Sequence, residues 1–219
     1  MNGQLTGINI NQVTADLKAF REAADNIVQK LSDASNTFGT IIVHNWSSPK
    51  AVEFAHQYSY KMVDIFIEPK KAFDAILNDA AIAASKMASA NGASFDPMNY
   101  FPMPYTMFYG HSALDDVVEA APGGEVGMNV DVVKAALEEF SSKVSQALAL
   151  TDSLPRNIAL YDSTGSLQAS FSSRISDAVN KVNEVVSSIT SAINASATTE
   201  ANTIISGVQT SIEAMMSGN

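Results

Sequence analysis

Apolar residues recur at alternating intervals of four and three residues in several segments of this chain, and this spacing restricts its fold more than any other feature. The first segment carries Val13, Leu17, Phe20, Ala24, Ile27 and Leu31 at these intervals. Such spacing keeps apolar side chains on one stripe of a helix, whereas a strand would require a spacing of two. The chain is therefore predicted to be helical, and each helix needs a partner that covers its stripe.

Three further segments show the same spacing. They carry Ala51, Ala55, Tyr58, Met62 and Ile65; then Val133, Leu137, Phe140, Val144, Ala147, Thr151, Leu154 and Ile158; then Phe171, Ile175, Ala178, Val182, Val185, Ile189 and Ala192, which Ile204, Val208 and Ile212 continue. Ser48-Pro49 predicts a helix start, because Ser caps free amides and Pro needs no amide partner there. Asn91-Gly92 predicts the end of that helix. Pro69 predicts a kink within it, and Pro155 weakens the third helix.

Residues 92–127 interrupt the pattern and form a predicted connector. They hold four of the seven prolines and a cluster of aromatic residues. Its candidate interaction residues are Tyr100, Phe101, Tyr105, Phe108 and Tyr109. Aromatic residues are enriched at protein interfaces, so the connector is either a docking surface or a flap folded over the helices. Within it, Ser112 and Asp115 predict the cap of one short helix.

The two halves of the chain are alike. Leu17-x-x-Phe20 matches Leu137-x-x-Phe140 at an offset of 120 positions, and Phe54 matches Phe171 at an offset of 117. We therefore predict an all-α fold in which two antiparallel helical hairpins form a coiled-coil-like four-helix bundle with shallow left-handed crossing. The hairpins are predicted at 1–91 and 128–219, joined by the connector at 92–127.

Composition excludes several classes of function. The chain has 13 basic and 23 acidic residues, a formal charge of −10, and no Cys. A nucleic-acid-binding protein needs a basic face, so no nucleic-acid partner is expected. No stretch approaches the roughly 20 apolar residues of a membrane helix. The N-terminal residues lack a basic region followed by an apolar one, so no cleaved signal peptide is expected.

No residue pattern predicts catalysis. The histidines, His44, His56 and His111, lack the spacing of a metal site with each other or with carboxylates. Pro122-Gly123-Gly124 lacks the Lys and Ser or Thr of a phosphate-binding loop. Catalysis needs a nucleophile or an acid–base pair held by a third group. We therefore expect no enzyme, no metal and no cofactor.

The passage from Asn45 to Phe54, with Trp46-Ser47-Ser48 between two amphipathic helices, resembles the WXG family of type VII secretion substrates. Ser48 stands where the family has Gly. Under the offset of 117, Ser163-Thr164-Gly165 is the corresponding turn, with Gly165 but without Trp. Tyr60-x-x-x-Asp64 matches the letters of the family's export signal but lies inside a predicted helix.

The resemblance implies a non-enzymatic helical protein that is secreted without a cleaved signal peptide and acts through protein–protein interaction. The implied partner is the secretion machinery, another helical hairpin protein or a second copy. The contact candidates are Trp46, Ser47, Ser48, Tyr60, Asp64 and Gly165. For Trp46 the alternative is a ring that packs the turn onto the helix ends.

Two other functions fit the same pattern. One is a structural coiled-coil component of a phage or injection apparatus, where helices rich in Ser, Ala and Asn are also usual. The other is a helical pore-forming toxin that uses the aromatic connector as its membrane-inserting segment.

Overall fold

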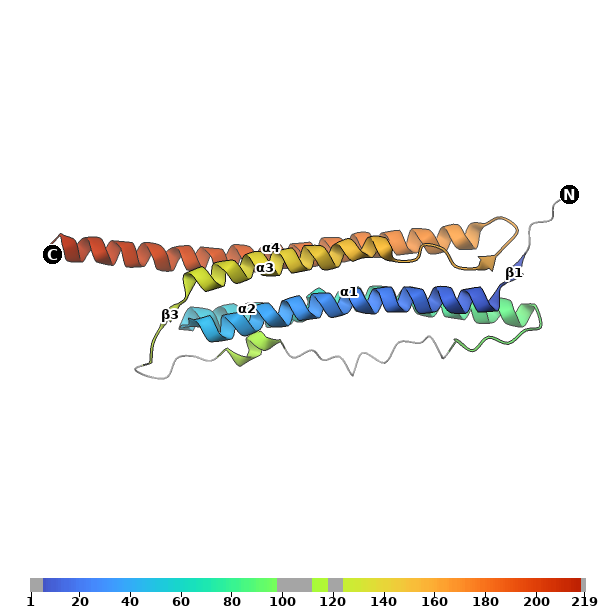
Figure 1. Cartoon of the computed structure of the whole chain (residues 1–219), viewed down its shortest axis with the longest axis horizontal. Helices are drawn as coiled ribbons and strands as arrows, with labels where there is room; N and C mark the ends of the chain where they lie inside the picture. The colour runs from blue at the N-terminus through green and yellow to red at the C-terminus, as the bar shows by residue number, and fades with distance from the viewer. Residues whose placement is uncertain (1–5, 98–111, 118–123, 218–219) are drawn as a thin grey trace. The chain divides into compact units, whose positions relative to one another are not determined.

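Four long α-helices dominate the computed structural model, which describes residues 6–97, 112–117 and 124–217 (Figure 1). They are α1 (Ile10–Asn45), α2 (Pro49–Ala90), α3 (Val130–Ala149) and α4 (Ser166–Met216). The helices pack against one another as an all-α helical bundle, so the predicted fold class is confirmed. The predicted connector aromatics Tyr100, Phe101, Tyr105, Phe108 and Tyr109 lie outside the described residues.

Short elements precede or join the helices. They are β1 (Gly7–Ile8), β2 (Trp46–Ser47), η3 (Ala113–Asp116), β3 (Gly127–Met128), η4 (Leu150–Ser153) and β4 (Leu160–Tyr161). Strand β1 pairs with β4, and β2 pairs with β3, both antiparallel. The strand that leads into each hairpin therefore pairs with the turn of the other hairpin.

Contacts divide the described residues into two units. Unit 1 consists of residues 6–30, 66–97 and 146–185, and unit 2 of residues 31–65, 112–117, 124–145 and 186–217. Each unit contains one of the two strand pairs and segments of both hairpins. The predicted hairpins at 1–91 and 128–219 divide the chain by sequence order. The two packed units divide it differently, since each contains residues of both hairpins.

The core of unit 1 is centred on Phe20, which is 1% exposed. Its ring lies edge-on to that of Phe73, with centroids 6.3 Å apart, and 6.2 Å from that of Phe171. Aromatic rings prefer such edge-on and tilted contacts to a face-to-face sandwich. Phe171 is only half-buried, contrary to prediction, because it lies in the second turn of α4, where the surrounding residues are largely exposed.

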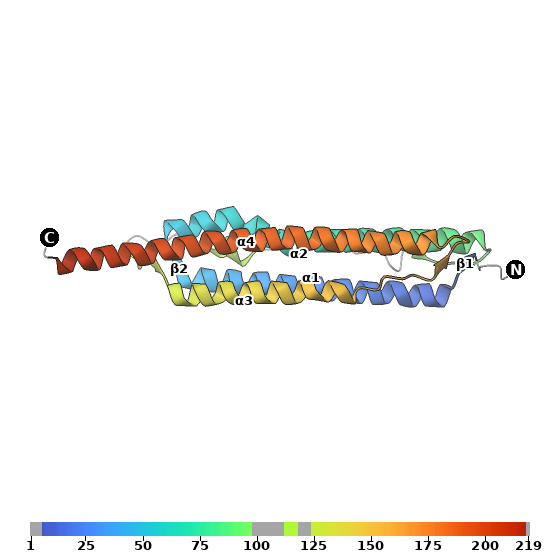
Figure 2. The same cartoon turned by 90° about the horizontal axis from the view of Figure 1, so that it is seen from above.

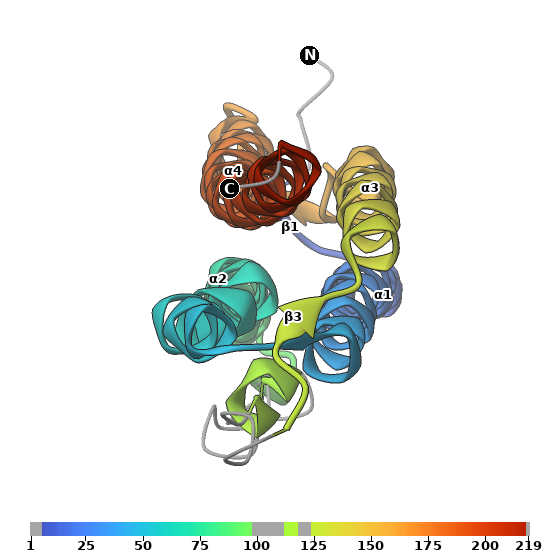
Figure 3. The same cartoon turned by 90° about the vertical axis from the view of Figure 1, so that its left-hand side faces the viewer.

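The core of unit 2 is centred on Phe140 of α3 and Phe38 of α1, whose rings stack with centroids 4.8 Å apart. Figure 3 looks along this unit and shows β3 crossing the turn between α1 and α2, where the chain enters α3. Ile42, Trp46, Phe54 and Met62 extend the core toward that turn, each 3% exposed or less.

The described part of the connector packs on α1. The cap predicted from Ser112 and Asp115 is confirmed: Ser112 and Asp115 form a reciprocal capping box at the start of η3. Leu114 is fully buried. Gly39 of α1 permits this approach, because a Cβ atom there would lie 2.9 Å from the Cβ of Ala113 and 3.3 Å from the amide nitrogen of Leu114.

The buried face of α4 differs from the predicted one. The buried positions are Ile175, Val179, Val182, Val186, Thr190, Ile193, Ala197 and Ala201. The predicted residues Ala178, Val185, Ile189 and Ala192 are only half-buried. From Val179 onward the spacing repeats every 11 residues as three, four and four, which is about 3.67 residues per turn and is typical of straight or slightly right-handed packing. Thr190 fits in this face because its hydroxyl donates to the carbonyl of Val186 at 2.8 Å.

Helix α2 shares this repeat at an offset of 117 positions. Its buried residues Met62, Ile65, Phe73, Ile76, Ala80 and Ala84 correspond to Val179, Val182, Thr190, Ile193, Ala197 and Ala201. Pro69 corresponds to Val186, and both are buried. The helix runs from Pro49 to Ala90 without a break at Pro69.

Helix α3 ends earlier than the apolar spacing predicts. It stops at Ala149, and after η4 the residue Leu154 is extended, with ψ 128°. The cause is Pro155, since a residue before Pro is driven out of the helical region. Leu154 and Ile158 remain buried, at 2% and 1% exposure, although neither is helical.

Candidate interaction surfaces

The turn between α1 and α2 encloses the side chain of Trp46. The ring is 1% exposed, and its centroid lies 5.1 Å from that of Phe54. The indole Nε1 donates to the Ser48 hydroxyl at 2.9 Å. Strand β2 holds the backbone here by pairing Trp46 with Met128. The ring therefore packs the turn onto the helix ends and presents no face to solvent.

Ser48 has two roles in this turn. Its hydroxyl oxygen accepts the Trp46 indole hydrogen and also accepts a hydrogen bond from the amide of Ala51, at 3.1 Å. The second bond caps one of the free amides at the start of α2. Glycine has no hydroxyl, so it would provide neither bond.

The outer side of the same turn is an open groove. His44, Ser47, Glu125 and Val126 are among the residues that line it. Val126 is 64% exposed and Ser47 is half-buried. A protein that bound this turn would contact these two residues and the paired backbone before it reached Trp46. No sequence signal pointed to Val126, because it belongs to no helical stripe.

The turn before α4 uses different side chains in the same backbone arrangement. Leu160 and Tyr161 pair with β1 as Trp46 and Ser47 pair with β3. Strand pairing therefore places Leu160, and not Ser163, at the position that corresponds to Trp46. Leu160 is 3% exposed.

Asp162 caps this second turn. Its carboxylate accepts hydrogen bonds from the hydroxyl and amide of Thr164 and from the amide of Leu167, at 2.8, 2.7 and 2.7 Å. The hydroxyl bond from Thr164 and the amide bond from Leu167 hold the pKa of Asp162 far below its usual range. Gly165 adopts φ +72°, a left-handed conformation that favours glycine.

Tyr60 and Asp64 lie one turn apart on the same side of α2. Tyr60 is 82% exposed and Asp64 is half-buried. The neighbouring Tyr58 is buried instead, with the ammonium of Lys61 5.1 Å from its ring centroid. Of this pattern, the Tyr60 side chain is thus exposed on the surface of unit 2.

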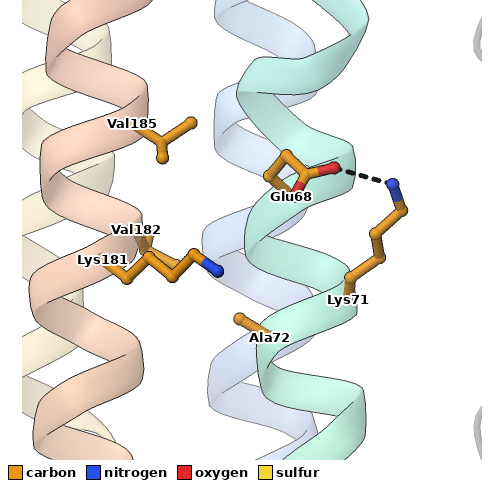
Figure 4. A pocket seen from close by; sticks show the side chains of 6 residues that line it. All are labelled: Glu68, Lys71, Ala72, Lys181, Val182 and Val185. Carbon is orange, nitrogen blue, oxygen red and sulfur yellow. Dashed lines mark hydrogen bonds and ion pairs between the residues drawn. The ribbon is translucent and has the colours of Figure 1, made fainter.

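A second groove lies between α2 and α4 in unit 1 (Figure 4). Ala72, Val182 and Val185 form its apolar walls, and Lys181 reaches across it from α4. Glu68 is bound to Lys71 at 2.7 Å. None of the lining residues is a Ser, Cys or His, so the groove provides no pair of nucleophile and base.

A buried ion pair in unit 1 joins Lys70 and Asp74 on successive turns of α2, with Nζ and Oδ2 2.9 Å apart and side chains 8% and 10% exposed. Burial raises the pKa of Asp74, and the bond from Lys70 offsets this only in part. Within the described ranges no three His, Cys, Asp or Glu side chains are grouped to hold a metal ion. Nor does any helix in those ranges have the length and apolar character to cross a membrane.

The end of α4 carries exposed apolar side chains. Val208, Ile212, Met215 and Met216 are 55%, 50%, 81% and 83% exposed. The apolar spacing predicted that Val208 and Ile212 would continue the core, but it indicates only which side of the helix is apolar. Figures 1 and 2 show this end of α4 running past the start of α3 in unit 2, where no described segment covers it.

Comparison of the chain with models of protein families, with curated proteins and with solved structures finds no match.

Proposed function

We propose that this chain is a non-enzymatic helical protein of the WXG type, exported through a type VII secretion machine without a cleaved signal peptide and acting through protein–protein contacts. The observation that carries the proposal is the turn of Trp46, Ser47 and Ser48. It joins two long amphipathic helices, and its indole is bound to the hydroxyl that caps the second helix.

The reciprocal strand pairs support a tandem arrangement. Because β1 pairs with β4 and β2 with β3, each hairpin holds the turn of the other. Members of the WXG family pair one hairpin with a hairpin from a second chain. In this chain the second hairpin belongs to the same polypeptide, so a further partner binds outer surfaces and not the helix stripes already covered.

The surfaces that remain support a role in binding another protein. Val126 and Ser47 line the outer side of the first turn, and Tyr60 with Asp64 lies on the exposed side of α2. Of these four residues Tyr60 is the one whose type is enriched at protein interfaces, and its place on a regular helix suits recognition by another protein.

Mass spectrometry of culture medium and cell lysate from the native host tests this proposal, with and without the secretion ATPase. The expected result is protein with its N-terminal residues intact in the medium, and its loss in the ATPase mutant. Protein found only in the cytosol or only in phage particles would contradict export and favour the structural role. Release of dye from liposomes by the purified protein would favour the pore-forming role instead.

Two variants separate recognition of the surface from damage to the fold. Tyr60→Ala removes an exposed ring and should leave folding unchanged, so a loss of export would identify the Tyr60 and Asp64 pattern as the signal. Val126→Ser tests the outer side of the Trp46 turn in the same way. Lys86→Ala, an exposed position 26 residues further along α2, serves as a surface control that should leave export unchanged.

A further inference from the structure

The apolar stripe of α4 continues beyond the part of the helix that other described elements cover. Ala197 and Ala201 are fully buried, whereas Val208 and Ile212 on the same stripe are about half exposed. Helix α2 ends at Ala90, which corresponds to Gly207 at the offset of 117. The exposed segment from Val208 to Met216 is therefore an extension for which α2 has no counterpart.

The stripe residues of this extension are spaced symmetrically about Val208. Ile204 and Ile212 lie four positions on either side of it, and Ala201 and Met215 lie seven positions on either side. In an antiparallel pair of identical helices centred at Val208, Val208 faces its own copy and Ile204 faces Ile212. A two-fold interface uses the same surface on both copies, and this spacing satisfies that requirement.

The charges of the segment favour a second copy over a charged partner. Residues 201–212 contain no charged side chain, although the chain as a whole carries −10. Two copies can therefore meet along these residues without placing carboxylates against each other. The antiparallel arrangement sets Glu213 opposite Thr203 and Glu200 opposite Met216, so no two carboxylates face each other.

We propose that the end of α4 pairs with the same segment of a second copy, antiparallel and centred at Val208. The contact is formed by Ile204, Val208 and Ile212, because Ala201, which lies opposite Met215, is already covered within its own chain. Stable interfaces use roughly 20–30 residues on each side, so a contact of this size is weak and depends on protein concentration. This self-association is independent of whether the chain is exported.

Disulfide cross-linking of the full chain tests the geometry, because the chain has no Cys of its own. Val208→Cys should form a covalent dimer rapidly under mild oxidation. Thr210→Cys is the matched control, since two residues further on, at about 200° around the helix, the side chain lies on the opposite side. Met215→Cys tests direction: in the antiparallel pair the two copies of position 215 are about 21 Å apart along the helices. Both controls should cross-link slowly.

Equal rates for Val208→Cys and Thr210→Cys would overturn the proposed face. Rapid cross-linking of Met215→Cys would overturn the antiparallel direction. Sedimentation equilibrium gives a readout without cysteine: the average mass of the natural sequence should rise toward that of a dimer with concentration. The variant with Val208→Glu and Ile212→Glu should stay monomeric, whereas that with Ser206→Glu and Thr210→Glu should behave like the natural sequence. A natural sequence that stays monomeric throughout, or two variants that behave alike, would contradict self-pairing.

Discussion

The turn of Trp46 in unit 2 and the turn of Leu160 in unit 1 share one backbone arrangement but use different side chains. In each, a two-residue strand pairs with the strand that leads into the other hairpin. The first turn is closed by an indole and capped by the Ser48 hydroxyl, whereas the second is closed by a smaller side chain and capped by the Asp162 carboxylate. Backbone pairing thus fixes the geometry, and the side chains are free to differ in charge.

The two cores differ in a related way. Phe20, Phe73 and Phe171 form the ring cluster of unit 1. The corresponding residues of unit 2 are Phe140, Thr190 and Phe54, so one ring is replaced by a small hydroxyl side chain. Phe38 stacks on Phe140 there. The core of unit 2 therefore takes one of its stacked rings from α1 and not from the position that corresponds to Phe73.

The paths that lead to the two turns differ in residue number and in how much of each is helical. Helix α1 has 36 residues, which span about 54 Å at the helical rise. The second path has 20 residues in α3 and 4 in η4, spanning about 38 Å, and then residues 154–159, which add up to about 20 Å if extended. Residues 154–159, none of which is helical, therefore take the place of helix in the second path.

The largest effect is expected for Trp46→Ala. Removing a ring that is 1% exposed should lower the free energy of unfolding by about 3–5 kcal/mol, more than Leu160→Ala at the corresponding position. Urea denaturation of the full chain measures both, and Tyr60→Ala is the control, expected to stay within about 0.5 kcal/mol. A loss below about 1 kcal/mol for Trp46→Ala would show that the ring does not close the turn.

The next effect concerns the close approach of η3 to α1. Gly39→Ala places a Cβ 2.9 Å from that of Ala113, so it should destabilise the fold by about 1–3 kcal/mol and speed amide hydrogen exchange at Leu114. Gly207→Ala is the matched control, since nothing lies within 4 Å of a Cβ there. That change should stabilise the chain by about 0.4–1 kcal/mol. Stabilisation by both variants would mean that η3 moves freely from α1.

The two caps should differ in their response to pH. Because its pKa is lowered on folding, Asp162 contributes stability above the pKa of an unfolded Asp, about 3.9, and this contribution falls away as the pH drops below that value. The difference in stability between the natural sequence and Asp162→Asn should therefore shrink with acid. Ser48→Ala should cost about 1 kcal/mol at every pH, because a hydroxyl does not titrate. Denaturation curves from pH 7 to pH 3 measure both, and a constant Asp162→Asn difference would contradict the cap.

The smallest effect is expected for Thr190→Val. The Thr190 hydroxyl bonds within its own helix, to the Val186 carbonyl. Replacement by an apolar side chain of similar shape should change the free energy of unfolding by less than about 1 kcal/mol. Phe73→Val at the corresponding position of α2 should cost more, since it leaves a cavity beside Phe20. Equal losses of unfolding free energy for Thr190→Val and Phe73→Val would contradict the proposed correspondence between the two cores.

The sequence predicted the four helices because each carries an apolar stripe, and it predicted the cap of η3 from Ser112 and Asp115. The buried face of α4 was predicted incorrectly, because one of its buried positions is occupied by a polar residue, Thr190. The paired strands were missed as well, since two residues are too few to show alternation. The residue corresponding to Trp46 was predicted at Ser163, three positions after its actual place at Leu160. The cause is that residues 163–165 have no counterpart in the turn of Trp46.

The candidate surfaces were less predictable than the fold. Periodicity identifies which side of a helix is apolar, but it does not indicate whether another element covers that side. For this reason Val208 and Ile212 were expected in the core, although they are exposed. Trp46 is the opposite case, because the sequence suggested an exposed contact and the side chain is buried. The residues Trp46-Ser47-Ser48 predicted a turn, but the burial of the ring depends on its packing against Phe54 and on the pairing of Trp46 with Met128.

The central claim is that the two hairpins of one chain hold each other through the strand pairs β1–β4 and β2–β3. Insertion of a protease site after Gly124 and cleavage of the folded protein test it directly. The two fragments should stay together as a one-to-one complex in size-exclusion chromatography and unfold in a single transition. Fragments that separate and are each folded as monomers would contradict the account.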